Sequence, residues 1–339
     1  MFHIVLPGLL GPVVQVDGDG HAADSVSFLL SFLRQSRQYP ACEPLPTDAL
    51  GFMGMAQSRP HAALSYLSDF GKLPDKLCFC CDPVHLKAGL ADAVLFDARE
   101  FTIEPEDALQ LIDAFNSHFA GDGMTLIFAD PKRWYLLAER EITIDTLPVR
   151  EVAGKNLGMV LPKGEYASVW NRLLNESQML FFEHAVNEAR QSQGFPEING
   201  VWVYGGDAVS SSLNIGYQRI ITDDALCKGV ALRAGTELPD VSEETPFEIH
   251  DHTFVYSERF DAALRRRDAS AWNAELCRMD ELLFRPLRQA VRNKHISKVV
   301  IDTGIQGRYE FTAGGFLNAW RAIRYHRRSL QSFINITSL

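Results

Sequence analysis

The sequence lacks any hydrophobic run that approaches the roughly 18 residues of a membrane-spanning helix. Its first ten residues hold a short apolar stretch without a preceding basic segment or a small-residue cleavage site, which is not typical of a secretory signal. Residues 2–6 are instead predicted to form a first strand that Pro7-Gly8 ends. We therefore expect no membrane partner and a cytoplasmic location.

Cysteine is scarce, with six in 339 residues, which excludes a disulfide-rich scaffold. Three of the six, Cys78, Cys80 and Cys81, lie close together on a predicted strand. Adjacent strand residues face opposite sides of a sheet, so these thiols pair poorly with one another. With His85 they could bind zinc, but the spacing fits no usual zinc site, and buried strand cysteines are the simpler interpretation. A reducing cytoplasm fits this cysteine usage.

Basic residues are in the minority, and their distribution is uneven. The formal net charge is −10. Residues 259–339 carry 15 Lys and Arg against 7 Asp and Glu, a net of +8, so residues 1–258 carry −18. Such a basic end could attract an anionic ligand or an acidic partner, or could complement the acidic body. The run of three arginines at 265–267 is too short to indicate nucleic-acid binding, so we expect no nucleic-acid partner.

The sequence does contain a regular alternation of apolar strands and amphipathic helices, most clearly after residue 164. This alternation predicts a mostly parallel sheet with helices on both faces. A long helix is predicted over 166–193, and another over 271–292 with a kink at Pro286. The other predicted elements are a hairpin at 124–128 and 133–139, strands at 76–81, 94–96, 201–204, 219–222 and 298–301, and helices at 24–38 and 102–119.

Acidic residues follow three of the predicted strands: Asp207, the pair Asp223-Asp224, and Asp302. Ligands in open α/β sheets gather at the carboxyl ends of the strands, so these positions are candidates for one common site. The alternative is that Asp302 is an aspartate of a turn or a helix N-cap.

Residues 175–235 resemble the archaeal-type branch of the 2,3-bisphosphoglycerate-independent (cofactor-independent) phosphoglycerate mutases. The likeness is carried in register by three motifs, at 184–190, 194–207 and 217–235, which the sequence predicts to be a helix, a strand with a Gly-rich exit, and a strand followed by a helix. Similarity at 78–85, 102–119, 134–137 and 271–304 extends it over most of the chain. The chain also resembles a bacterial subgroup labelled RpfE-type regulatory proteins.

The resemblance implies an α/β fold of the alkaline-phosphatase-like superfamily. Its core would be a mostly parallel sheet with helices on both faces, formed by residues 1–75 and 196–330. An α+β cap domain would be inserted at 76–195, and residues 331–339 would form a tail.

The resemblance also implies a chemistry, and the sequence departs from it. Such enzymes hold two divalent metals with Asp and His side chains and use a Ser or Thr nucleophile to carry a phosphoryl group. Pro7-Gly8 stands where the family has a metal-binding Asp followed by Gly. Asp302 is kept without its His, and Asp261 matches a family Asp that also lacks its His. Residues 39–70 contain no counterpart of the nucleophile.

Two hypotheses follow from these departures. The first is a catalytically degenerate, regulatory protein that binds a small phosphorylated anion or a protein partner. The second is an active phosphoryl-transfer enzyme, a phosphoglycerate mutase or a related phosphatase, with manganese or another divalent metal. Its catalytic residues would include Asp261 and Asp302, and its metal ligands would include His250, His252 and Asp302. A structural role in an enzyme complex is a third possibility.

Several polar residues in the resembling stretch are candidates for ligand binding. His184, Asn187 and Arg190 recur at three-residue spacing and could form a polar strip on one helix, or a hydrogen-bond network that anchors the helix end. The backbone at Gly205-Gly206 could approach a phosphate, or could form a plain tight turn. The full set of candidates is His184, Asn187, Arg190, Gly205, Gly206, Asp207 and Lys228.

Overall fold

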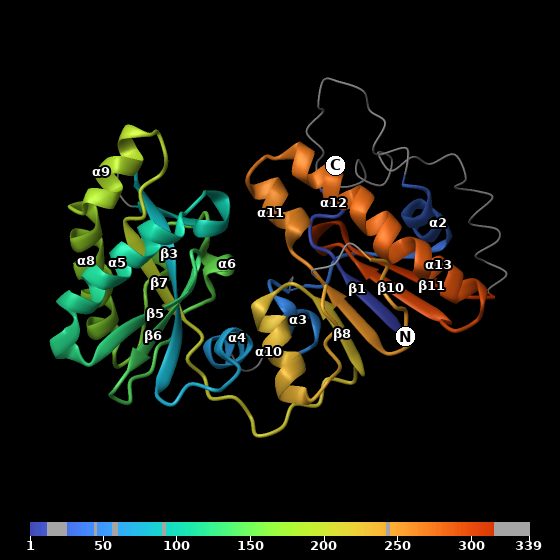
Figure 1. Ribbon diagram of the computed structural model, residues 1–339, viewed down its shortest axis with the longest axis horizontal. Coiled ribbons are helices and arrows are strands. Elements are labelled where there is room, and N and C mark those ends of the chain that lie inside the picture. The colour runs from blue at the N-terminus through green and yellow to red at the C-terminus, as the bar shows by residue number, and fades with distance from the viewer. Residues whose placement is uncertain (12–25, 44–45, 56–59, 90–92, 242–244, 315–339) are drawn as a thin grey trace. The chain divides into compact units, whose positions relative to one another are not determined.

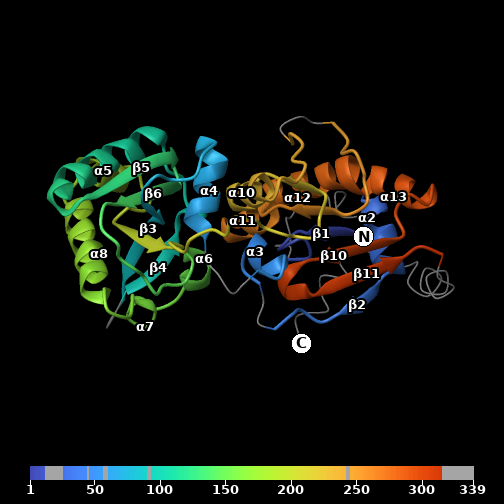
Figure 2. The ribbon, with the colours of Figure 1, turned by 90° about the horizontal axis from the view of Figure 1, so that it is seen from below.

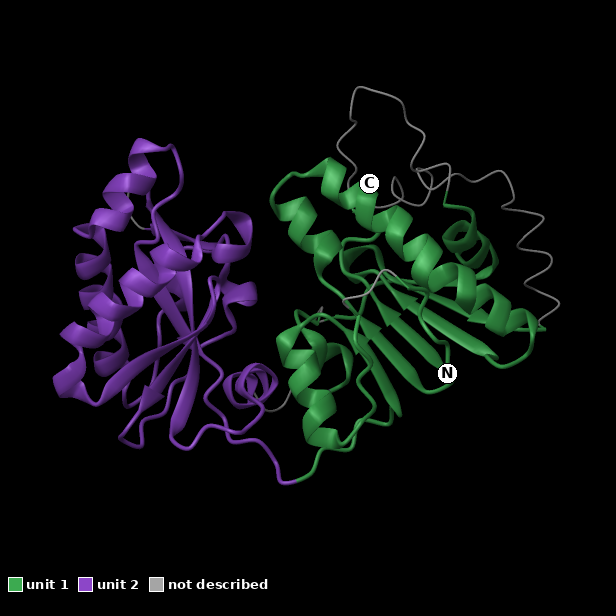
Figure 3. Ribbon diagram, viewed as in Figure 1, with its two compact units in different colours: residues 1–54, 212–339 green, residues 55–211 purple. Residues whose placement is uncertain are grey.

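The computed structural model describes residues 1–11, 26–43, 46–55, 60–89, 93–241 and 245–314 (Figure 1). The chain folds into two compact units: unit 1 consists of residues 1–54 and 212–339, and unit 2 of residues 55–211 (Figure 3). The tail expected at 331–339 lies outside the described residues. Within the described ranges, no helix is long and apolar enough to cross a membrane.

Unit 1 is built on a six-stranded sheet in the order β2-β11-β10-β1-β9-β8. The four strands from β10 to β8 are parallel, and an antiparallel pair, β11 and β2, extends one edge. Because β1 lies between β9 and β10, both ends of the chain build this sheet, as the resemblance implied. The strands are β1 (Phe2–Val5), β2 (Arg37–Tyr39), β8 (Arg219–Thr222), β9 (Thr253–Tyr256), β10 (Lys298–Asp302) and β11 (Arg308–Thr312).

Helices cover both faces of the unit 1 sheet (Figures 1 and 2). On one face, α2 (Ser27–Gln35), α11 (Arg259–Arg265), α12 (Ala269–Met279) and α13 (Arg285–Arg292) bury apolar side chains against strand residues such as Ile4 and Val255. Successive strand residues face opposite ways, so Tyr256 lies on the other face, where its ring packs on Phe52 of α3 (Ala49–Phe52). Next to α3 lies α10 (Ala225–Ala234). The expected α/β fold class is confirmed.

A π-helix, Asp280–Phe284, joins α12 to α13 directly before Pro286. Proline has no backbone N–H, and its ring clashes with the carbonyl four residues earlier, here that of Leu282. The Leu282 carbonyl instead accepts a hydrogen bond from the Phe247 backbone N at 2.8 Å. The π-turn thus accommodates the proline inside a continuous helical segment.

Unit 2 contains a sheet in the order β4-β3-β6-β5, with β7 also paired to β3, and all of these pairings are antiparallel. Among its described residues, four helices of eight or more residues accompany it: α4 (His61–Phe70), α5 (Pro105–His118), α8 (Ala167–Phe182) and α9 (Ala185–Ser192). Its core includes fully buried Trp134 and Trp170. This is the α+β composition expected of a cap. The strands are β3 (Leu77–Ala88), β4 (Ala93–Asp97), β5 (Met124–Asp130), β6 (Arg133–Ala138) and β7 (Gly200–Tyr204).

The boundaries between the two units differ from the expected ones, which were between residues 75 and 76 and between residues 195 and 196. Residues 55–75 fall in unit 2, where α4 (His61–Phe70) packs on β3. Residues 196–211 fall there too, because β7 pairs with β3 rather than with the unit 1 sheet. Asp207 therefore follows a strand of the unit 2 sheet, whereas Asp223 and Asp302 follow strands of the unit 1 sheet.

The long helix predicted over 166–193 is also interrupted. It is two helices, α8 and α9, separated at Glu183-His184. His184 has an extended backbone, and its Nδ1 accepts a hydrogen bond from the Val186 N at 3.2 Å, so it acts as the N-cap of α9.

Candidate functional site

The carboxyl ends of β10 and β1 meet in a tight group of backbone contacts in unit 1. The Leu6 N donates to the Asp302 carbonyl at 2.9 Å, and the Gly8 N donates to the Thr303 carbonyl at 3.3 Å. The Trp272 Nε1 donates to the Gly8 carbonyl at 3.0 Å, which fixes α12 against the same turn. This edge is where ligands gather in open α/β sheets.

The start of α11 lies against this turn. A Cβ atom added at Gly8 would lie 3.0 Å from the Asp261 backbone N and 2.9 Å from the Leu264 Cδ1. Gly8 also has φ +83°, which favours glycine. A Cβ at Gly304 would lie 3.6 Å from the Pro7 Cα. The fold thus brings together three positions to which the resemblance points, those of Pro7-Gly8, Asp261 and the 302–304 turn.

The acidic side chains at this edge are occupied by other groups of the protein. The Asp261 Oδ2 accepts a hydrogen bond from the Arg265 Nε at 2.7 Å, one turn further along α11. The Asp302 Oδ1 accepts a hydrogen bond from the Gly304 N at 3.1 Å, so it behaves as a turn aspartate. Burial raises the pKa of Asp302, and this backbone hydrogen bond opposes the rise. Thr303 donates its hydroxyl to the Gly307 carbonyl at 2.8 Å.

A charge network lies at the ends of β8 and β9. The Arg259 Nε donates to the Asp223 Oδ2 at 2.5 Å, and Arg278 makes a bidentate pair with Glu275 at 2.7 and 2.8 Å. A 3.7 Å contact between Arg259 and Glu275 joins the two pairs. Of these four residues, only Asp223 was a candidate from the sequence. The i,i+3 spacing of Glu275 and Arg278 on a predicted helix was the one available signal.

The hollow beside this network is small. It is lined by apolar side chains, including Ile221, Phe247 and Met279, together with Arg259 and Arg278. Its volume of about 10 Å³ has room for a single water molecule. A larger ligand would enter this hollow only if the side chains that line it moved apart.

The donor set does not fit the two-metal centre that the resemblance implies. Pro7 offers no side-chain ligand atom, Asp261 is bound by a guanidinium, and Asp302 is bound by a backbone N–H. Across the described ranges, no three His, Cys, Asp or Glu side chains form a group that could hold a metal ion. No reaction step can therefore be derived through a metal at this edge.

His250 and His252 lie at the opposite end of the strands of the same sheet. They precede β9, so they are at its amino end, whereas Asp261 and Asp302 follow the carboxyl ends of parallel strands. Both side chains are about half exposed. His250 lies 3.6 Å from Glu248, and His252 lies 3.5 Å from Asp251. The structure does not bring these candidate ligands together with Asp302.

Asn187 and Arg190 are buried, and their polar atoms are used within unit 2. The Asn187 side chain donates to the carbonyls of Phe181 and Ile198 at 2.8 and 2.9 Å and accepts from the Ile198 N at 2.8 Å. The Arg190 guanidinium donates to Asp107 at 3.0 Å and to the carbonyls of Pro196 and Thr102 at 2.9 and 2.8 Å. These contacts match the anchoring network that was the alternative interpretation.

The glycines after β7 serve close packing. A Cβ at Gly205, where φ is +72°, would lie 2.7 Å from the His61 Cβ, and a Cβ at Gly206 would lie 2.1 Å from the Phe79 ring. Asp207 follows them with an exposed side chain. Lys228 belongs to unit 1, where it lies half-buried on α10, the helix that Asp224 caps through the Cys227 N at 2.8 Å. Lys228 and the other ligand-binding candidates are therefore in different units.

Comparison with known proteins supports the resemblance. No family model matches the chain. It is 21% identical over 180 residues to a 2,3-bisphosphoglycerate-independent phosphoglycerate mutase of Methanosarcina mazei, covering 51% of this chain and 44% of that protein. It is 26% identical over 171 residues to a 2,3-bisphosphoglycerate-independent phosphoglycerate mutase 2 of Methanothermobacter thermautotrophicus, covering 48% and 41%. The matched region spans less than half the length of these relatives.

Similar solved structures include the following two. The PH0037 protein of Pyrococcus horikoshii has a TM-score of 0.46 at 16% identity, covering 93% of this chain and 87% of that one. A cofactor-independent phosphoglycerate mutase of Thermoplasma acidophilum has a TM-score of 0.39 at 16% identity, covering 93% and 90%. The chain is similar in sequence to archaeal-type cofactor-independent phosphoglycerate mutases.

Proposed function

We propose that this chain is a phosphoglycerate-mutase-like protein that has lost phosphoryl transfer and acts in regulation by binding a small phosphorylated anion or a protein. The observation that carries the proposal is the contact between Arg265 and Asp261. A guanidinium bound to a carboxylate neutralises the charge that a divalent metal would need. The arginine also supplies no metal-binding atom of its own, because it stays protonated in proteins.

The rest of the edge supports the same proposal. The first strand ends in Pro7-Gly8, which has no ligand side chain, and the Asp302 carboxylate is engaged by its own turn. Losing metal ligands abolishes a reaction that depends on metals to stabilise developing charge. Three guanidiniums, those of Arg259, Arg265 and Arg278, remain near this edge and could re-pair with an anionic ligand.

The alternative is an active metal-dependent enzyme, a phosphoglycerate mutase or a related phosphatase. It is favoured by the convergence of Pro7-Gly8, Asp261 and the 302–304 turn at one sheet edge. Activity would require Asp261 to exchange Arg265 for a metal ion. The two proposals therefore differ in what the Asp261 carboxylate binds.

Metal analysis of the purified chain, with mutase and phosphatase assays in the presence of manganese, tests this difference. We expect no stoichiometric metal and no turnover in the wild type or in Arg265→Ala. The matched control is Arg285→Ala, which removes an i,i+4 arginine–glutamate pair on α13 away from the edge. Stoichiometric manganese, with turnover that Asp302→Ala abolishes, would establish the enzyme and reject the degenerate protein.

The binding role has its own test. Isothermal titration with phosphoglycerate and inorganic phosphate should detect an anion that Arg259→Gln weakens and Arg285→Ala does not. If neither anion binds, partners are captured from the native cell with the wild type, Arg259→Gln and Arg285→Ala. This experiment decides between a protein ligand and no regulatory role. A partner retained equally by wild type and Arg259→Gln would place its binding surface elsewhere.

A further inference from the structure

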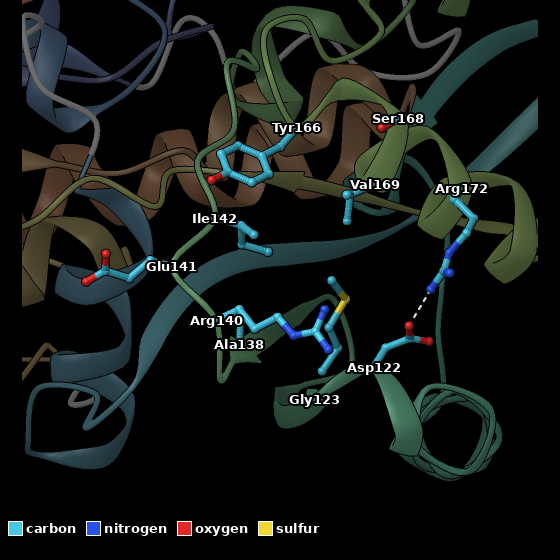
Figure 4. Close-up of a pocket in the computed structure, with 11 residues that line it drawn as sticks. Asp122, Gly123, Ala138, Arg140, Glu141, Ile142, Tyr166, Ser168, Val169 and Arg172 are labelled. Carbon is cyan, nitrogen blue, oxygen red and sulfur yellow. Dashed lines mark hydrogen bonds and ion pairs between the residues drawn. The ribbon is translucent and has the colours of Figure 1, made fainter.

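Unit 2 contains a hollow of about 450 Å³ that the proposed function does not use (Figure 4). It lies between the β5–β6 hairpin and the first turns of α8. Its residues all belong to unit 2, so its properties are independent of the carboxyl edge of unit 1. The volume falls within the range of small-molecule sites, roughly 300–1,000 Å³.

The walls of the hollow are mostly apolar. Met124 and Ala138 come from the hairpin strands, Ile142 from the segment after β6, and Val169 from α8. Met124, Ala138 and Ile142 are themselves at least 92% buried, so the floor is part of the packed domain. Tyr166 adds an aromatic ring with a hydroxyl at the rim. Such a lining favours a flat apolar body.

One cation in the hollow is free to bind a ligand. The Arg172 guanidinium is already paired with Asp122 at 2.5 Å and with Glu176 at 3.6 Å. Arg140 is an exposed residue, and among the described residues it has no hydrogen-bond or ion-pair partner. Figure 4 shows its side chain extending across the hollow, whereas Glu141 points away from it.

We propose that this hollow binds a small monocarboxylate with an apolar body, whose carboxylate pairs with Arg140. A guanidinium presents parallel N–H donors that match the two oxygens of a carboxylate. Arg172 is shared between Asp122 and Glu176, so the exposed Arg140 is the guanidinium of this lining that is left to pair with an anion. A monoanion balances the charge of Arg140.

The same charges disfavour a phosphate monoester. After pairing with Arg140, a dianion would still carry one negative charge, and the Asp122 carboxylate of the lining would repel it. The site is thus distinct in chemistry from the phosphorylated ligand proposed for unit 1.

Titration of the full chain with 3-phenylpropanoate, phenyl phosphate and 3-phenylpropanol, followed by NMR chemical shifts or calorimetry, tests the proposal. We expect 1:1 binding of 3-phenylpropanoate, with both other probes at least about tenfold weaker, because a charge-assisted hydrogen bond is lost or a dianion is repelled. Arg140→Gln should weaken 3-phenylpropanoate by about tenfold or more. The control Lys163→Gln, an exposed cation of the same unit outside the hollow, should stay within about twofold.

A second variant tests the cavity itself. Val169→Phe keeps Arg140 and fills the apolar wall, so it should abolish binding of 3-phenylpropanoate while leaving the far-UV circular dichroism unchanged. No binding up to roughly 10 mM, an affinity unchanged in Arg140→Gln or Val169→Phe, or tighter binding of phenyl phosphate would each overturn the proposal.

Discussion

Asp280 caps a helix that lies about 250 residues away in the sequence. Its Oδ1 accepts a hydrogen bond from the Leu29 N at 2.6 Å, and its Oδ2 accepts one from the Phe28 N at 3.3 Å. These are two of the first backbone N–H groups of α2, which have no partner within the helix. The helix has no side-chain cap of its own at Val26. The π-turn of unit 1 thereby ties α2 to the α12–α13 segment.

Replacing Asp280 by Ala should destabilise unit 1 by about 1–3 kcal/mol, since the buried Leu29 N–H and the partly buried Phe28 N–H lose their acceptor. The control is Glu281→Ala, the exposed neighbour that pairs only with Arg285, for which we expect a change below about 0.5 kcal/mol. Urea denaturation gives both values. Equal effects of the two variants would contradict the capping role.

Asp82 should make unit 2 less stable as the pH rises from about 4 to 7. Its carboxyl accepts a hydrogen bond from the Tyr204 hydroxyl at 2.8 Å, yet burial raises its pKa from 3.8 to about 7. A raised folded-state pKa contributes stability below pH 3.8 that is lost as the pH rises through 7. Asp82→Asn should therefore gain stability over the wild type as the pH increases from 4 to 7, by at most about 1.4 kcal/mol per pH unit. Asp113→Asn, an exposed control on α5, should show no such trend in urea denaturation.

His3 should have the reverse effect in unit 1. Burial, with the nearby charges of Arg308 and Lys298, lowers its pKa from 6.5 to about 3. Its Nδ1 lies 2.7 Å from the Tyr217 hydroxyl, and its ring contacts Phe254. A lowered folded-state pKa contributes stability above pH 6.5 that is lost as the pH falls toward 3.

Comparison of wild type with His3→Phe between pH 7.5 and 5 measures this contribution, because most carboxylates are still ionised there. The wild type should lose up to about 1.4 kcal/mol per pH unit more than the variant below pH 6.5. If the free energies of unfolding of wild type and His3→Phe change in parallel over this pH range, His3 is protonated in the folded protein as it is in the unfolded chain.

Gly206 should not tolerate a methyl group. Its Cβ would lie 2.1 Å from the ring of Phe79, a side chain that is 1% exposed and held in the unit 2 core. We expect Gly206→Ala to lower the melting temperature, with a cost of about 1–3 kcal/mol from overpacking. At Gly121, where a Cβ meets nothing within 4 Å, the same substitution should be close to neutral. If Gly206→Ala does not change the stability, the result would favour the interpretation that this backbone approaches a phosphate.

Asn187→Ala discriminates between anchoring and ligand binding. It removes three hydrogen bonds and leaves the Ile198 N–H and two carbonyls without this partner, so we expect a loss of about 2–4 kcal/mol in stability. His184→Ala removes a single 3.2 Å cap and should cost about 1 kcal/mol or less. If Asn187→Ala instead folds as stably as the wild type but loses binding of phosphoglycerate, the residue belongs to a ligand site.

Short-range patterns in the sequence predicted many elements of this fold. The strands at 2–6, 219–222 and 298–301 and the hairpin at 124–139 were found because apolar runs and turn residues mark them locally. β9 was missed, since its four residues follow the polar segment 248–252. The break in the long helix was missed because the capping histidine sits inside an uninterrupted helical pattern.

Partners of strands and side chains were harder to predict. β3 continues through Pro83, where its partner on one side changes from β6 at Cys80 to β4 at Val84 while β7 stays paired on the other side. The assignment of β7 to unit 2 depends on pairing with a strand more than a hundred residues earlier. The side chains that pair at the carboxyl ends of the strands could not be predicted for the same reason, since Arg259 and Asp223 are 36 residues apart in the sequence.

The insertion of unit 2 sets an order of events during synthesis. Unit 2 is continuous, so all of its strands are available once residue 211 has emerged from the ribosome. β1 is made first but must wait for β9 and β10, more than 250 residues later, before it has a neighbour on either side. Domains fold as units during translation, and a first strand that waits so long exposes an unpaired edge. The nascent chain should therefore depend on chaperones until the last third of the sequence is complete.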